Sequence, residues 1–210
     1  SGYTGSNVDN VESFNGTSWT ETTEINTSRT WGVGGAGTTT SGIIFGGYTT
    51  TNVNNVESWN GSAWTETTEI NTARTGVGSA GASNTDALVA GGDIHPSSPR
   101  FSNSVEKWDG SSWTEVSEIN TGRLDGAGAG ATSTDAMIFG GASTPNSENE
   151  TETWNGSSWT EVSELATAMR YQASQSNGTT SSAICAGGSS SGPSQNEATV
   201  QEWGTPFSLT

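Results

Sequence analysis

The sequence has little positive charge, one cysteine and one histidine. Six Lys and Arg residues stand against 22 Asp and Glu, which gives a formal net charge of −16. This negative field repels nucleic-acid backbones and anionic membranes, so we expect neither as a partner. Cys185 alone can form neither an intrachain disulfide nor a cysteine-based zinc site, and no second His exists to share a metal with His95. The sequence therefore predicts no cofactor and no metal held by Cys or His; calcium bound by loop carboxylates stays an open alternative, although no Asp-x-Asp-x-Asp-Gly loop is present.

Long apolar runs and helical periodicity are also missing. No apolar run approaches the roughly 20 residues needed to span a bilayer, and no signal peptide is recognisable. Any targeting or anchoring segment is therefore expected outside this chain. The best helix candidate, residues 22–26, is too short and too rich in Thr. With only 29% hydrophobic residues, the composition alone could suggest disorder, but nine Trp argue for a packed core.

Most of these Trp residues mark an internal repeat. The segment from Val11 to Glu21 returns from Val56, from Val105 and from Thr151, and a partial copy begins at Val200. The steps are 45, 49, 46 and 49 residues, which is typical of propeller blades. Each complete copy has an aromatic residue, then Asn-Gly or Asp-Gly, then a Trp, which predicts a β-hairpin. We expect these rings to cover the interfaces between blades.

Two further strands precede each hairpin. A Gly/Ala-rich stretch predicts an innermost strand, where blades crowd the axis. An apolar run ending in Gly-Gly predicts a second strand buried on both faces. An Arg opens each unit, 17 residues before the Gly-Gly, and we expect it to pair with a repeated Glu or a carbonyl inside its blade. The four opening residues are Arg29, Arg74, Arg123 and Arg170.

The Gly-Gly strand end, the aromatic before the turn and the Trp after it resemble the kelch repeat over nearly the whole chain. The repeat departs from the usual kelch pattern by using Trp or Phe before Asn-Gly, where Tyr-Asp is common. The segments WNGSSWTEVSEL and AMIFGG are similar to kelch-like repeats of marine bacteriophage virion and tail-fibre proteins. This resemblance implies a virion or extracellular location, other virion proteins as neighbours, and attachment to a host.

The predicted fold is all-β, a kelch-type β-propeller of four-stranded antiparallel blades in a single domain over residues 1–210. Four sets of inner strands are present. Either the C-terminal inner strands complete the N-terminal hairpin and close the ring with mixed terminal strands, or the chain is part of a larger ring. Assembly as a homo-oligomer is compatible with both. The units are 1–28 (partial), 29–73, 74–122, 123–169 and 170–210 (partial).

The loop between the second and third strands varies in length, which is typical of a binding face. The longest insertion starts at Asp93 and holds the only His. Ordinary polar propeller loops would look the same, and His95 is more simply an exposed loop residue than a ligand. The candidate binding residues on these loops are Tyr48, Asp93, His95, Arg100, Phe101 and Asn146.

Catalytic motifs are not recognisable. The acidic residues recur at equivalent strand positions, whereas an active site usually breaks symmetry. We therefore expect a non-catalytic structural or adhesion module that binds a surface glycan or a protein partner. The alternatives are a kelch-type sugar-processing enzyme and an intracellular kelch scaffold. The enzyme would need an asymmetric cluster at one mouth of the ring, for which the sequence offers His95, Arg100 and Tyr171.

Overall fold

The computed structural model describes residues 2–143, 146–174, 178–190, 196 and 198–204. Every regular element among these residues is a β-strand, and no helix there could cross a membrane. The strands are β1 Gly2–Tyr3, β2 Asn7–Val8, β3 Glu12–Phe14, β4 Trp19–Glu21, β5 Gly34–Thr38, β6 Ser41–Phe45, β7 Val56–Trp59, β8 Trp64–Thr67, β9 Gly78–Ser83, β10 Asp86–Ala90, β11 Val105–Trp108, β12 Trp113–Val116, β13 Ala127–Thr132, β14 Asp135–Phe139, β15 Thr151–Trp154, β16 Trp159–Glu161, β17 Ala173–Ser174, β18 Ser182–Ala186 and β19 Val200–Gly204.

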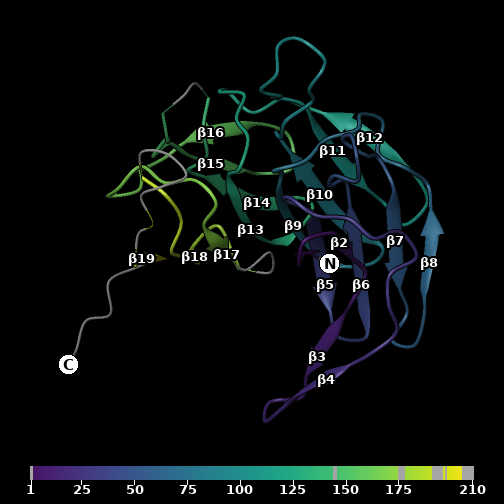
Figure 1. Cartoon of the computed structure of the whole chain (residues 1–210). Helices are drawn as coiled ribbons and strands as arrows, with labels where there is room; N and C mark the ends of the chain where they lie inside the picture. The colour runs from purple at the N-terminus through teal and green to yellow at the C-terminus, as the bar shows by residue number, and fades with distance from the viewer. Residues whose placement is uncertain (1, 144–145, 175–177, 191–195, 197, 205–210) are drawn as a thin grey trace.

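Three complete blades follow one another around a common axis (Figure 1). Their sheets run β5-β6-β7-β8 (blade 1), β9-β10-β11-β12 (blade 2) and β13-β14-β15-β16 (blade 3), and all neighbours are antiparallel. The first strands β5, β9 and β13 lie side by side at the axis, and the fourth strands lie outermost. The predicted fold, a kelch-type β-propeller with four-stranded blades, is confirmed.

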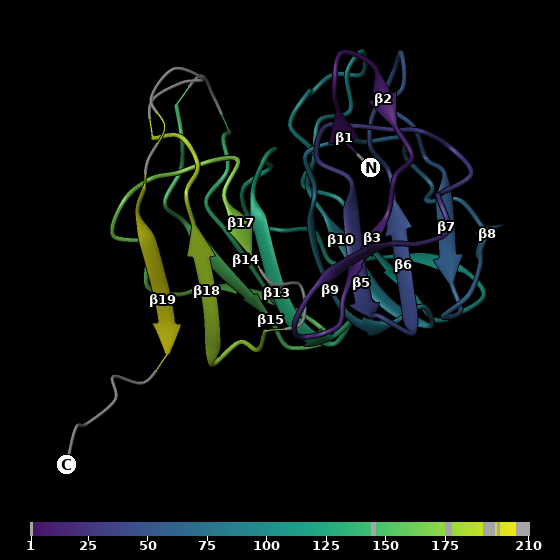
Figure 2. The same ribbon diagram turned by 60° about the horizontal axis from the view of Figure 1, so that its bottom comes forward.

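The two ends of the chain form incomplete blades at the two ends of an arc (Figures 1 and 2). The N-terminal hairpin β3–β4 is a sheet of its own, and the C-terminal sheet is β17-β18-β19. The third-strand position beside β18 is therefore held by β19 and not by β3. Of the two predicted modes of closure, the mixed terminal blade is not formed by the described residues.

The inner strands are glycine-rich because the blades meet backbone to backbone at the axis. A Cβ on Gly128 in β13 would lie 2.4 Å from the carbonyl oxygen of Ser79 in β9. The Gly-Gly after each second strand has a different cause, since Gly46 and Gly47 both have positive φ (67° and 102°). Steric contacts make that region costly for other residues. The glycines of the inner strands are thus explained by the close approach of neighbouring backbones, and the Gly-Gly pairs by their positive φ angles.

The hairpin aromatics of blades 2 and 3 cover the interfaces between blades, as predicted, but the prediction is wrong for the first copy, where Phe14 and Trp19 are 44% and 66% exposed. Trp108 and Trp113 of blade 2 stack at 5.3 Å between ring centroids and pack on Ile43, Phe45 and Val56 of blade 1. The Trp113 ring meets Phe45 edge-on at 5.2 Å, and its indole Nε1 donates to the Thr68 carbonyl of blade 1 at 3.0 Å. Blade 3 repeats the arrangement on blade 2 with Trp154 and Trp159.

The repeated Arg pairs with the repeated Glu of its own unit, which confirms the sequence prediction. The pairs are Arg29–Glu57, Arg74–Glu106 and Arg123–Glu152, and all six side chains are at most 1% exposed. Each guanidinium also donates to backbone carbonyls, those of Gly91 and Ser104 in the case of Arg74. The ion pair therefore joins the segment that enters a blade to the blade's second and third strands.

The fourth unit differs, and the assignment of Arg170 as its opening Arg is wrong. The Met169 carbonyl accepts the Gly141 N–H at 2.7 Å, as the Arg123 carbonyl accepts the Gly92 N–H at 2.8 Å. Met169 therefore holds the position of the buried Arg, and Arg170 lies one residue further on. The facing position, occupied by Glu in the other units, is Gln201, whose side chain bonds both the N–H and the carbonyl of Thr167 at 3.3 Å. In this unit the uncharged residues Met169 and Gln201 stand where the other units have a buried Arg–Glu ion pair.

Candidate functional site

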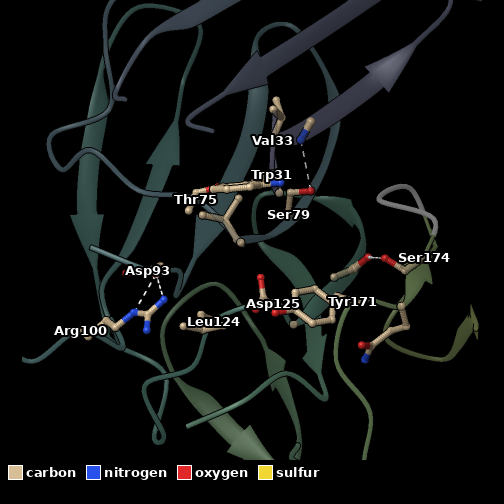
Figure 3. A pocket seen from close by; sticks show the side chains of 18 residues that line it. Trp31, Val33, Thr75, Ser79, Asp93, Arg100, Leu124, Asp125, Tyr171 and Ser174 are labelled. Carbon is tan, nitrogen blue, oxygen red and sulfur yellow. Dashed lines mark hydrogen bonds and ion pairs between the residues drawn. The ribbon is translucent and has the colours of Figure 1, made fainter. Parts of the chain in front are cut away.

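A cavity of about 810 Å³ opens at one mouth of the propeller, where the chain enters the innermost strands (Figure 3). Segments from all four units line it, and so does the longest insertion. Its volume lies within the range usual for small-molecule sites. Its lining includes the aromatic and polar side chains of Trp31, Asp93, Arg100, Asp125, Tyr171 and Gln172.

A chain of backbone hydrogen bonds runs around this mouth and links the blades. The N–H of Gly76 donates to Gly32, that of Asp125 to Gly76, and that of Tyr171 to Asp125, at 3.1, 2.7 and 3.0 Å. We call these four residues the mouth ring. Each has φ between 56° and 64°, so the repeat demands a left-handed residue at this point. Glycine meets that demand in two units, and Asp and Tyr replace it in the other two.

Backbone strain among the described residues concentrates at this cavity. Trp31, Asp125 and Tyr171 are the three non-glycine residues there with positive φ, at 51°, 56° and 59°, and all three line the cavity. A left-handed conformation costs a bulky residue on the order of 1–3 kcal/mol, and such residues gather at functional sites. These three side chains are therefore held in a conformation that carries a steric cost.

Asp125 and Tyr171 form the chemical centre of the cavity. Burial raises the pKa of Asp125 to about 6, although the neighbouring Tyr171 hydroxyl and the charge of Arg170 oppose this. Burial, followed by the charge of Asp125, raises the pKa of Tyr171 above its ordinary value. The Gln172 Oε1 is buried beside them and has no hydrogen-bond partner among the described residues. The cavity thus offers the Asp125 carboxyl group and the Tyr171 hydroxyl to a ligand, whereas the Gln172 amide is turned toward the Phe139 carbonyl, to which its Nε2 donates at 3.3 Å.

The long insertion delivers a charged pair to the opposite side of the cavity. Arg100 reaches back to Asp93 with Nε at 2.8 Å and Nη2 at 2.5 Å from Oδ2, and that bond raises the pKa of Arg100. The Asp93 Oδ1 accepts the His95 N–H at 2.8 Å, which shapes the loop. Asn52 of blade 1 holds the same loop by donating to the carbonyls of Asp93 and His95. Arg100 keeps more than half of its side chain exposed, and its remaining donors are accessible to a ligand.

The six candidates from the sequence fall into three groups. Asp93 and Arg100 line the cavity. Tyr48 stands at its rim, with its ring centroid 4.8 Å from that of Trp31. The other three do not line it: Phe101 pairs with Asp93 through the backbone, and His95 and Asn146 are exposed in the loops.

Asp125 and Trp31 are the important residues that the sequence argument missed. The signal for Asp125 was present, because Arg123-Leu124-Asp125 aligns with Arg74-Thr75-Gly76 and replaces a glycine. Tyr171, expected as an asymmetric residue, lies beside Asp125 in the cavity (Figure 3). Within the described residues, no three His, Cys, Asp or Glu side chains gather closely enough to hold a metal ion.

The raised pKa of Asp125 predicts a pH-dependent stability. Near pH 4 the folded state keeps the proton, so burial of this group costs little; as the pH rises through about 6, the folded state must bury a charge and loses stability. We expect Asp125→Asn to melt like the wild type at pH 4 and roughly 2–6 °C higher at pH 7.5. Scanning calorimetry at both pH values measures this. Glu24→Gln, which removes an exposed carboxylate, controls for net charge; an equal rise in both variants would contradict the assignment.

No family model and no curated protein matches this sequence. The chain is similar to a solved structure titled "Structure of YjhT", with a TM-score of 0.76 and 12% sequence identity. The match covers 96% of this chain and 74% of that one. That neighbour is a β-propeller, and the likeness establishes the fold.

Proposed function

We propose that this chain is a binding module that recognises a glycan at the mouth of its propeller. The observation that carries the proposal is the convergence of all three strained non-glycine residues of the described chain on one cavity, together with the charged pair from the longest loop. A purely architectural propeller needs only glycine at the mouth ring.

The cavity suits a sugar chemically. The exposed faces of Trp31 and Tyr171 can pack on the apolar C–H face of a sugar ring. Asp125 can accept hydrogen bonds from sugar hydroxyls, and the free guanidinium donors of Arg100 can bond ring or hydroxyl oxygens. A few polar groups among apolar walls are typical of a pocket that fixes the orientation of its ligand.

Phage attachment belongs to the same proposal. Repeats similar to those of virion and tail-fibre proteins, and a net charge of −16 that disfavours nucleic acid, support a virion or extracellular module that touches a host-surface glycan.

A glycan array followed by calorimetric titration of the hits tests this proposal. We expect Asp125→Gly to weaken a bound glycan by tenfold or more, as about 1.4 kcal/mol of lost contact would do. The fold should be retained or gain stability, because Gly76 is the natural residue at the equivalent position. His95→Ala is the control, since His95 lies outside the cavity. Binding that ignores Asp125 and follows His95 would move the site to the loops, and no bound glycan would refute the proposal.

A catalytic role is the second candidate, because an Asp with a pKa of about 6 beside a Tyr hydroxyl is able to exchange protons near neutral pH. Incubating each array hit with the protein and following it by NMR separates the two candidates. The binding proposal expects unchanged glycan. Turnover that Asp125→Asn abolishes while binding persists would establish an enzyme.

A further inference from the structure

Each blade presents two different faces to its neighbours. In blades 1 and 2 the face toward the following blade carries an aliphatic pair from the second and third strands, Ile43 with Val56 and Leu88 with Val105. The face toward the preceding blade carries the stacked hairpin aromatics, such as Trp108 and Trp113 in blade 2. We call these the forward face and the backward face. Every interface between complete blades joins one of each.

The C-terminal sheet leaves its forward face bare. Ile184 in β18 and Val200 in β19 hold the positions of Ile43 and Val56. They are 42% and 60% exposed, whereas Ile43 and Val56 are each 1% exposed.

The N-terminal hairpin leaves its backward face bare. Phe14 and Trp19 are 44% and 66% exposed, whereas Trp108 and Trp113 are 1% and 7% exposed. The bare rings are nevertheless already arranged for packing: their centroids lie 5.2 Å apart at 38°, against 5.3 Å and 37° for the Trp108–Trp113 pair.

We propose that the two bare faces are one interaction surface in two halves, and that Phe14 and Trp19 of a second copy of this chain pack on Ile184 and Val200. The two interfaces between complete blades supply the argument, because the same aliphatic and aromatic positions already bury one another there. The contact is head-to-tail: it uses a different face from each copy and leaves one face of each kind free at the ends, so successive copies add to a chain or close a ring.

Closure within one copy is disfavoured by the buried charges. If β3 replaced β19, the Glu12 carboxylate would face Met169, where the other units have an Arg. The residue now at that position, Gln201 of β19, is neutral; its Oε1 accepts the Thr167 N–H and its Nε2 donates to the Thr167 carbonyl. A buried carboxylate without a cation is strongly destabilising. In Figure 1 the β3–β4 hairpin and the β17-β18-β19 sheet also stand at opposite ends of the arc.

Sedimentation velocity over a range of protein concentrations tests the proposal. We expect the wild type to assemble, and Trp19→Ala and Ile184→Glu each to weaken assembly roughly tenfold or more, since each removes one half of the contact. Trp31→Ala removes an aromatic side chain of similar exposure, 61%, at the cavity mouth and should assemble like the wild type. Far-ultraviolet circular dichroism verifies that each variant is folded.

Mixing the two variants gives the sharper test. Trp19→Ala keeps an intact forward face and Ile184→Glu an intact backward face, so an equimolar mixture should form a 1:1 dimer and nothing larger. A wild type that stays monomeric, an assembly that survives both changes, or a mixture that fails to pair would each overturn the proposal. These readouts are independent of glycan binding, because Trp19 and Ile184 lie outside the mouth cavity.

Discussion

Replacing Arg74 by Met should lower the free energy of unfolding by about 3–5 kcal/mol. The guanidinium bonds Glu106 at 2.6 Å and donates to the carbonyls of Gly91 and Ser104 at 3.1 and 2.9 Å. Both charged side chains are fully buried. The substitution strands the Glu106 carboxylate away from water and away from its cation, which is the costly way to break such a pair. Urea unfolding followed by circular dichroism measures the loss.

The double variant Arg74→Met with Glu106→Gln is the matched control, because the fourth unit already carries Met169 and Gln201 at these positions. It should recover a substantial part of the lost stability, since no charge then remains buried. If the double variant is as unstable as Arg74→Met alone, the loss comes from the carbonyl contacts and not from the unpaired carboxylate.

Truncating Trp113 to Ala should have a comparable effect, about 3–5 kcal/mol. The ring is 7% exposed and fills the interface against Phe45, and its Nε1 donates across that interface to Thr68. Removing it leaves a cavity and an unpaired carbonyl between blades 1 and 2. The melting temperature and the urea midpoint should both fall.

Trp19→Ala provides the comparison at the same strand position, because that ring is 66% exposed. Measured in dilute solution, where copies of the chain are separated, it should change stability by less than about 1 kcal/mol. Equal losses in the two variants would mean that the hairpin Trp stabilises its own hairpin and not the interface between blades.

The sequence predicted the blade well because each of its signals is local or repeated. Phe or Trp before Asn-Gly or Asp-Gly, with Trp after it, predicted the hairpins, and the observed registers Trp59↔Trp64 and Trp108↔Trp113 agree. The recurrence of Arg and Glu gave the buried ion pairs. Neither inference needs knowledge of how the blades are arranged.

Residue spacing predicted the wrong equivalent of the buried Arg in the fourth unit, because the chain has one extra residue there. Arg170 stands 17 residues before its Gly-Gly, as the other Arg residues do, yet Met169 occupies the buried position. The 11-residue step from Trp159 to Arg170, one longer than in the other units, was the available warning. Only the backbone hydrogen bonds decide which residue is equivalent.

The sequence predicted only part of the cavity lining, because some of these residues are recognisable only from their backbone conformation. Loop length variation pointed to Asp93 and Arg100, which do line the cavity. Asp125 was hidden because its meaning depends on a left-handed backbone, and a sequence displays the residue without its φ angle.

The mouth ring also has a consequence for how such a protein can change. Its links between blades run from N–H to carbonyl, so the side chains at its four positions take no part in them. Gly, Asp and Tyr already occupy these positions without altering the hydrogen bonds. Mutations can therefore change the side chains at these four positions one at a time while the backbone hydrogen bonds between the blades are kept. The chemistry of the cavity can change in this way without a change of fold.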